Sequence, residues 1–309
     1  MTRTGVGLPP DAHGAYAVCG QITRTQARNF AYGIALLPAA KRRAMTAVYA
    51  TARQIDDIGD GMLPAQRKRE LLARTREELH QLGQSGHPQE LPDRGGAAGW
   101  SADPVRVALA DAAGRMPIPL AAFDELIDGC EADVAGRKYS SFDELLWYCR
   151  CVAGSVGRLS VGVYDPADIE RAWAPADALG VALQLTNILR DLREDRHENR
   201  VYLPQHDLDR FGCTLELNQA GNIADPPERF AALVRFEAAR AEAWYVDGLR
   251  LLPMLDRRSA ACTAAMAGIY HRLLQRIAAE PDTVRSTRLS LSAAAKLAVA
   301  VRALTAVRA

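Results

Sequence analysis

The chain has no uninterrupted apolar run of the roughly 18 or more residues that a membrane-spanning helix needs. Its N-terminus carries Pro9, Pro10 and Asp11 where the apolar segment of a signal peptide would lie. These absences argue against a membrane-spanning or secreted protein, and we expect a cytoplasmic one. The alanine-rich end, residues 289–309, is interrupted by lysine and arginine. It could lie as a peripheral segment against the inner face of a membrane, but an amphipathic helix facing solvent is the better interpretation.

An excess of charge of one sign and metal-spaced cysteines are also missing. Lysine and arginine number 38 against 37 aspartate and glutamate, so the net charge is +1 and no nucleic-acid partner is expected. The six cysteines lack the spacing of a zinc site, and we interpret them as reduced thiols that are mostly buried. The six histidines show no metal-ligand spacing either.

Alternating strand patterns and a glycine-rich nucleotide-binding loop are absent as well. Most of the chain instead repeats apolar residues at helical spacing, which predicts an all-α bundle. Residues 1–11 are expected to form a flexible tail, and residues 83–100 a flexible loop. The expected helices cover residues 12–30, 38–58, 64–82, 103–116, 119–133, 141–157, 175–197 (opened by Pro175), 227–252 and 257–279, with a last one from about residue 290.

Two rows of oxygen-bearing side chains recur at a spacing of four residues. One row runs from Asn187 through Asp191 to Asp195, and the other joins Asp56 to Asp60 at the end of an earlier helix. Four residues advance a helix by about 400°, so each row lies on one helix face. Carboxylate and amide oxygens suit Mg²⁺, which binds through one or two carboxylates together with substrate phosphates. A solvated acidic stripe paired with neighbouring arginines is the alternative for one row, but two rows favour Mg²⁺ ions on a diphosphate.

Gly154 and Gly157 lie within an apolar helix, where glycine is less stable than alanine. Such positions make sense where the backbone must approach a ligand or another helix closely. The sequence leaves both interpretations open.

Beyond the two aspartate rows, four segments carry a resemblance to a known family. They are residues 23–30, 36–43, 152–157 and 200–204. In this order and at these separations, the segments and rows resemble the squalene/phytoene synthase family over about residues 20–280. Members of that family join two prenyl diphosphates head to head. The resemblance implies a single-domain, isoprenoid-synthase-like helical bundle over residues 1–309 with a central apolar cavity.

The resemblance also implies roles for particular residues. The family uses its two aspartate rows to hold several Mg²⁺ ions on both substrate diphosphates, while an apolar cavity shields the allylic cation from water. The implied metal ligands are Asp56, Asp60, Asn187, Asp191 and Asp195, of which the four aspartates are the implied catalytic residues. The residues expected to bind substrate are Arg28, Phe30, Arg53, Gln184, Asn187, Arg200, Tyr202 and Tyr270.

One departure from the family pattern bears on the product. Squalene and carotenoid enzymes usually have a tyrosine at one of the two positions before Val152, where this chain has Arg150 and Cys151. Because that tyrosine is associated with later steps, its absence favours a reaction that stops at presqualene diphosphate. We therefore expect two farnesyl diphosphates to condense with release of diphosphate, without NADPH, as in the bacterial presqualene diphosphate synthases of squalene and hopanoid biosynthesis.

Two alternatives to that reaction stay open. A phytoene or dehydrosqualene synthase of a carotenoid pathway is the alternative within the family. A non-catalytic helical scaffold is the rival from another class, and the intact aspartate rows argue against it.

Overall fold

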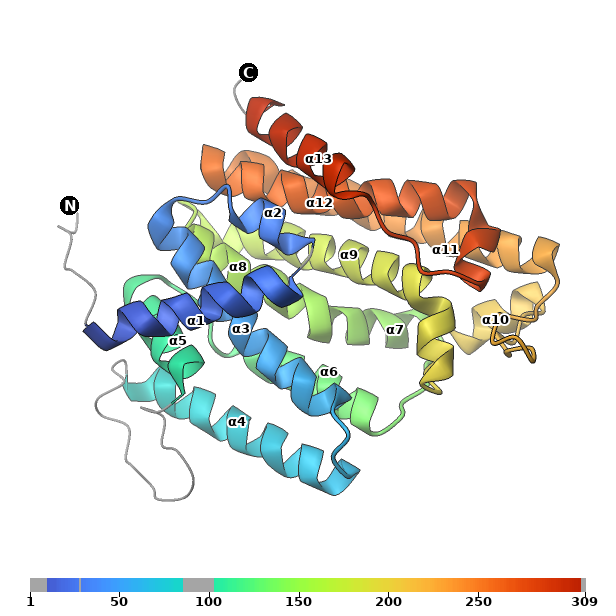
Figure 1. Cartoon of the computed structure of the whole chain (residues 1–309), viewed down its shortest axis with the longest axis horizontal. Coiled ribbons are helices and arrows are strands. Elements are labelled where there is room, and N and C mark those ends of the chain that lie inside the picture. The colour runs from blue at the N-terminus through green and yellow to red at the C-terminus, as the bar shows by residue number, and fades with distance from the viewer. Residues whose placement is uncertain (1–9, 28, 86–102, 307–309) are drawn as a thin grey trace.

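The computed structural model describes residues 10–27, 29–85 and 103–306, and this part of the chain is almost entirely helical (Figure 1). Its only β-type pairing is an isolated bridge between Leu217 and Ile223. The predicted all-α class is therefore confirmed. The α-helices are α1 (Pro10–Gln26), α2 (Phe30–Ile34), α3 (Ala39–Asp60), α4 (Ala65–Ser85), α5 (Pro104–Arg115), α6 (Ala122–Val134), α7 (Phe142–Cys149), α8 (Ser155–Tyr164), α9 (Ile169–His197), α10 (Gln205–Phe211), α11 (Pro227–Gly248), α12 (Arg257–Ala279) and α13 (Ala293–Ala306), joined by a π-helical turn η3 (Arg150–Gly154) and the 3₁₀ turns η4 (Leu249–Met254) and η5 (Pro281–Arg285).

Helix α9, 29 residues long, is the central element and packs against α8, α11 and α12 (Figure 1). The Asp168 side chain caps it by accepting a hydrogen bond from a backbone N–H of the first turn. The helix therefore begins at Ile169, and the prediction that Pro175 opens it is wrong. Pro175 lies inside the helix, where it offers no N–H to the preceding turn. Burial of Ala172 and Ala176 on either side of the proline offsets that loss.

Helices α8 and α9 approach each other so closely that only glycine fits at their contact. A Cβ atom at Gly157 would lie 2.4 Å from the carbonyl oxygen of Ala176, and one at Gly180 would lie 2.4 Å from that of Ala153. A Cβ at Gly154 would meet a side chain of α9 at 2.3 Å. Helix packing therefore accounts for both sequence-marked glycines, because a larger residue would force the two backbones apart.

The apolar interior is divided into two main clusters. One gathers residues of α9, α11 and α12, and the other gathers residues of α3, α5, α6 and α8. Phe30 and Val152 pack against both. A cavity lies where the clusters meet, since Met45 of the second cluster and Leu179 and Leu273 of the first all line it.

Several smaller expectations can be compared with this fold. All six cysteines are buried and none is paired, as predicted. Helix α4 extends to Ser85, three residues into the segment expected to be a loop. Helix α1 begins at Pro10, within the expected tail. The rest of the tail, residues 1–9, and the loop residues from 86 onward lie outside the described part of the chain.

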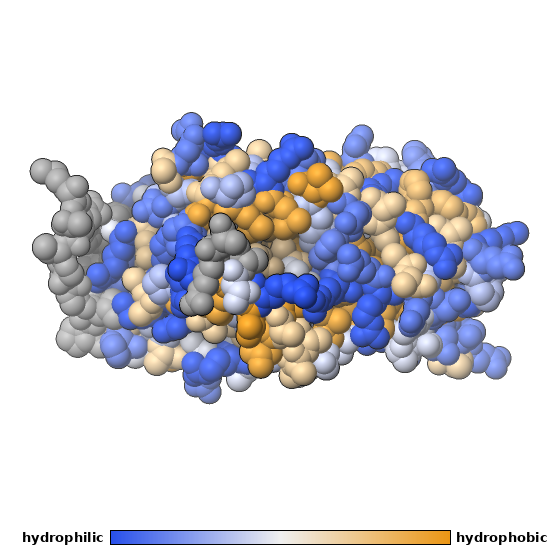
Figure 2. All heavy atoms as spheres, turned by 90° about the horizontal axis from the view of Figure 1, so that it is seen from above, coloured by the Kyte–Doolittle hydropathy of each residue, from blue (hydrophilic) through white to orange (hydrophobic). Residues whose placement is uncertain are grey.

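The C-terminal helix α13 carries apolar side chains on the surface. Leu297 and Val301 are more than half exposed, and the face seen in Figure 2 mixes apolar and charged side chains. In the described part of the chain, no helix is both long enough and apolar enough to cross a membrane. Peripheral membrane contact of this end, the less favoured of the two interpretations of the sequence, stays a prediction.

Candidate active site

A cavity of about 790 Å³ runs between α3, α8, α9 and α12 and confirms the expected central cavity. On α3 its lining extends from Met45 to Asp56, and on α9 from Ala176 to Asn187 and on to Arg190. The first two stretches each cover eleven residue steps, about 16 Å at 1.5 Å per residue. We call the end near Asp56 and Asn187 the charged end, and the opposite end, near Met45 and Ala176, the closed end.

The last turn of α3 brings the first aspartate row to the charged end. Asp56 lines the cavity, while Asp60 is exposed beyond it. Arg53, one turn earlier, forms its ion pair with Asp57 and leaves its own Nε buried without a partner. Among the described residues, Asp56 accepts a hydrogen bond only from the Cys130 thiol, at 3.7 Å. Burial, and then the neighbouring charge of Asp60, raises the pKa of Asp56 to about 7.

In the second row, Asp191 is the residue with cationic partners. Arg190 and Arg288 both donate to its carboxylate, Arg288 through Nε at 2.6 Å and a terminal nitrogen at 3.1 Å. Burial alone would raise the pKa of Asp191, but these hydrogen bonds hold it below its ordinary value. The acidic-stripe interpretation therefore describes Asp191 but not the whole row. The sequence did not mark Arg288, which lies 97 residues from Asp191.

The other two members of this row are oxygens without a matching cation. Asn187 places its amide nitrogen 3.5 Å from the Gln184 side-chain oxygen, and its own Oδ1 is buried without a hydrogen-bond partner among the described residues. Asp195 is partly buried, and burial followed by the charge of Asp191 raises its pKa to about 8. Asn187 Oδ1 and the Asp195 carboxylate thus lie on one helix face as oxygens that a cation would stabilise.

This donor set fits Mg²⁺. The oxygens of Asp56, Asn187 and Asp195 are hard ligands whose burial costs free energy until a cation or donor compensates them. Among residues 10–27, 29–85 and 103–306, no group of three or more His, Cys, Asp or Glu side chains is close enough to hold a metal alone. The two rows therefore do not form one closed protein cage. That arrangement suits Mg²⁺, which keeps water molecules and shares its coordination with phosphate oxygens.

Arg200 links the two rows from the segment after α9. It donates to the Asp60 carboxylate at 2.9 Å, and its charge acts on Asp195 as well. Next to it, Asp133 of α6 accepts hydrogen bonds from Tyr148 and Tyr202, both at 2.9 Å. Asp133 was missed from the sequence, because partners 15 and 69 residues away leave no spacing pattern.

The position of Tyr148 changes the argument about the missing tyrosine. The π-helical turn η3 separates α7 from α8 and shifts the helical register between them. Tyr148 is buried outside the cavity lining and stacks on Tyr202 beside the charged end, with ring centroids 5.0 Å apart. Arg150 forms an ion pair with Asp177, and Cys151 is buried. The absence of tyrosine at positions 150 and 151 therefore does not leave this end of the site without one.

The remaining residues expected to bind substrate fall into three groups. Phe30, Arg53, Gln184, Asn187 and Tyr270 line the cavity, and the rings of Phe30 and Tyr270 stack at 5.5 Å. The expected diphosphate pair, Arg200 and Tyr202, lies beside the acidic residues rather than in the cavity lining. Arg28 lies outside the described residues. The structure thus brings together most of the predicted set and adds Arg190, Arg288 and Asp133 to it.

Comparisons with known proteins agree with this geometry. The family model described as squalene/phytoene synthase matches residues 23–295. A phytoene synthase of Mycobacterium tuberculosis is 48% identical over 290 residues, which cover 94% of this chain and 90% of the relative. A 15-cis-phytoene synthase of Synechocystis is 34% identical, over 92% of this chain and 82% of the relative.

Solved structures show the same fold. A dehydrosqualene synthase solved with a ligand has a TM-score of 0.81 at 24% identity, over 96% of this chain and 98% of the other. Squalene synthase HpnC of Alicyclobacillus acidocaldarius has a TM-score of 0.75 at 26% identity, over 88% of this chain and 96% of the other.

The class that these findings define is the head-to-head prenyltransferases with an isoprenoid-synthase fold. The chain belongs to the squalene/phytoene synthase family. The scaffold alternative has no support from them.

Proposed function

We propose that the chain is a phytoene synthase, which joins two molecules of geranylgeranyl diphosphate into the forty-carbon hydrocarbon phytoene. The observation that carries this proposal is the 48% identity to mycobacterial phytoene synthases along nearly the whole chain. The expected condensation of farnesyl diphosphate to presqualene diphosphate is favoured less. It depended on the missing tyrosine, and Tyr148 lies beside the charged end, where it donates to Asp133 and stacks on Tyr202.

The residues of the charged end suit the first step of such a reaction. Asp56, Asn187 and Asp195 would hold Mg²⁺, which stabilises the negative charge of a departing diphosphate. Arg190 and Arg288 line the cavity, and each guanidinium group can donate two parallel hydrogen bonds to two oxygens of a diphosphate. The donor's C–O bond breaks and its electrons leave with the diphosphate. The resulting allylic cation is attacked by a double bond of the acceptor, and a proton is then lost.

The apolar walls suit the rest of the chemistry. Met45, Val48, Leu179 and Leu273 exclude water from the cavity, and water would otherwise capture a carbocation as an alcohol. Loss of the second diphosphate and of a further proton then gives the hydrocarbon.

The test is to incubate the purified protein with geranylgeranyl diphosphate and Mg²⁺ and to identify the extracted products by mass spectrometry. We expect phytoene and two diphosphates per turnover, with no dependence on NADPH. A thirty-carbon cyclopropyl diphosphate made from farnesyl diphosphate, with no product from the longer substrate, would instead support the presqualene alternative. Diphosphate release from neither substrate would contradict both.

A further inference from the structure

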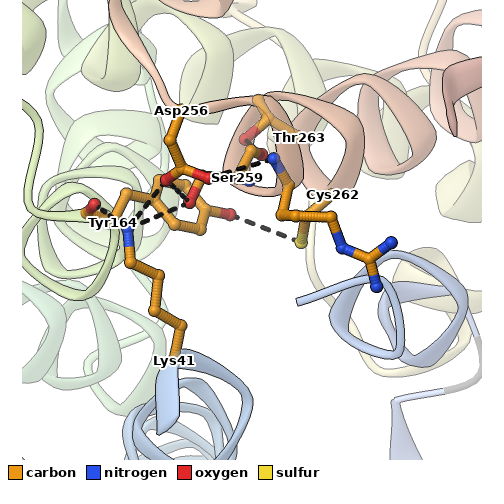
Figure 3. Close-up of polar contacts among 7 residues, drawn as sticks. Lys41, Tyr164, Asp256, Ser259, Cys262 and Thr263 are labelled. Atoms are coloured by element: carbon orange, nitrogen blue, oxygen red, sulfur yellow. Dashed lines mark hydrogen bonds and ion pairs between the residues drawn. The ribbon is translucent and has the colours of Figure 1, made fainter. Parts of the chain in front are cut away.

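The closed end of the cavity is held by a group of polar contacts that we call the clasp, formed by Lys41, Asp256 and the backbone carbonyl of Tyr164 (Figure 3). Lys41, in the first turn of α3, donates to that carbonyl, which ends α8, and pairs with Asp256 at 2.7 Å. Asp256 in turn caps α12 by accepting from the backbone N–H groups of Arg258 and Ser259. One ammonium group therefore connects the ends of three helices.

The Tyr164 side chain lines the cavity at this level. It is 2% exposed and belongs to α8, and its hydroxyl lies 3.6 Å from the Cys262 sulfur on α12. Its ring therefore spans the gap between the two helices (Figure 3). The residues that end the lining on α3, α9 and α12 at this level are smaller or unbranched, namely Met45, Ala176 and Thr263.

We infer that Tyr164, fixed by the clasp, is the floor that sets the longest prenyl chain the cavity accepts. This inference rests on the proposed prenyltransferase function and makes Tyr164 a specificity-determining residue. The clasp fixes the backbone from which the ring projects. The position of the ring therefore follows from three helix ends rather than from a flexible loop.

The length of the Tyr164 side chain is close to the length of one isoprene unit. With carbon–carbon bonds of about 1.5 Å, one five-carbon unit adds about 5 Å to an extended chain, and a tyrosine ring with its hydroxyl extends about 5–6 Å beyond Cβ. Removing the ring should therefore open space for about one further unit. Filling the smaller Ser160, one turn before Tyr164 on the same helix face, should remove similar space.

The experiment measures kcat/KM with prenyl diphosphates of fifteen, twenty and twenty-five carbons. In Tyr164→Ala we expect the ratio of the twenty-five- to the twenty-carbon substrate to rise at least about tenfold, since one methylene in a closed apolar pocket already changes kcat/KM by about 10- to 200-fold. In Ser160→Leu we expect the ratio of the twenty- to the fifteen-carbon substrate to fall by a similar factor. Tyr245→Ala is the matched control, because this equally buried tyrosine lies outside the cavity lining and should change neither ratio.

Binding measurements distinguish a failure of this inference from a failure of the proposed function. Unreactive prenyl thiolo-diphosphates of the three lengths are titrated by calorimetry. The dependence of affinity on chain length then tests the role of Tyr164 even if no product forms. Unchanged length preference in a folded Tyr164→Ala variant, judged by helical circular dichroism, would overturn the inference. If that variant does not fold, unchanged preference in Ser160→Leu overturns it. A wild-type protein that binds prenyl chains by length but releases no diphosphate contradicts the function and leaves the floor intact.

Discussion

The two ends of the cavity treat their polar groups in opposite ways. At the closed end, burial alone would raise the pKa of Asp256, but hydrogen bonds from Lys41 and Ser259 lower it to about 2. At the charged end, Asp56 and Asp195 have raised pKa values and Asn187 Oδ1 has no partner. The polar groups of the closed end therefore have their partners within the folded chain. Those of the charged end would gain theirs from a bound cation and a diphosphate. The contacts that stabilise the fold and the groups suited to catalysis therefore lie at opposite ends of a cavity about 16 Å long.

The largest expected effect comes from neutralising the charged end. Asp195→Asn keeps the shape of the side chain and removes its charge, so we expect kcat with geranylgeranyl diphosphate to fall about 100- to 1,000-fold. Because the carboxylate lacks an ion pair among the described residues, the melting temperature should stay the same or rise. Steady-state kinetics and thermal unfolding on the same preparation test both halves. A large drop in melting temperature would mean that Asp195 is structural.

The next prediction concerns the missing partners of the charged end. Mg²⁺ with inorganic diphosphate should raise the melting temperature, because a ligand at 100 times its dissociation constant adds about 2.7 kcal/mol to the free energy of unfolding. Differential scanning fluorimetry measures the shift with and without a chelator. The shift should largely disappear in Asp195→Asn and persist in Lys41→Met, which changes only the closed end. An equal loss in both variants would remove the distinction between the two ends.

Breaking the clasp should have the reverse outcome. Lys41→Met leaves the Tyr164 carbonyl and the Asp256 carboxylate without their ammonium partner, and we expect a loss of about 1–3 kcal/mol in the free energy of unfolding. Urea denaturation measures this loss, while kcat with the preferred substrate should fall less than about threefold. Lys68→Met is the matched control, because Lys68 donates to one backbone carbonyl, that of Gly59, and forms no ion pair among the described residues. It should lose less stability than Lys41→Met.

The sequence predicted what depends on local spacing. The rows from Asp56 to Asp60 and from Asn187 to Asp195 were visible, because a helix turns i and i+4 side chains to one face. The helices themselves followed from periodicity, although Pro175 was placed at a helix start that Asp168 in fact provides about two turns earlier. A proline is a strong local signal, but a good cap and buried alanines outweighed it.

What the sequence did not predict depends on contacts between distant segments. Arg288 reaches Asp191 across 97 residues, and Lys41 reaches Asp256 across 215, with no pattern in either stretch that announces the pairing. The sequence interpretation, which assumed a regular helix, placed Tyr148 on a different face from Cys151, three residues later. The π-helical turn after it changes that register, and five-residue irregularities of this kind leave no clear mark on composition. Asp133 was invisible for the same reason as Arg288.

Glu237, a buried carboxylate outside the cavity lining, extends the comparison between the two ends. Arg240 of α11 donates to Asp207 at 2.8 Å and to Glu237 at 2.8 and 3.0 Å, so two buried carboxylates share one guanidinium. Glu237 is 2% exposed, and burial raises its pKa to about 8 despite Arg240. By pKa alone it resembles Asp195, yet it does not line the cavity.

Glu237→Gln therefore tests whether a raised carboxylate pKa marks a functional group or only a cost in stability. Because the folded-state pKa of Glu237 lies above the unfolded value of 4.5, its contribution to stability is complete below that value and is lost as pH rises through about 8. The wild-type free energy of unfolding should thus fall more than that of Glu237→Gln as pH rises from 4.5 to about 8, by about 1.4 kcal/mol for each unit of the pKa shift, as measured by urea titrations. Activity should be unchanged at every pH, since the substituted group touches no part of the site. If activity were lost in parallel with stability, a raised pKa would mark a carboxylate needed for activity even outside the cavity lining. The position of a carboxylate along the cavity would then be a poorer guide to its role than its pKa.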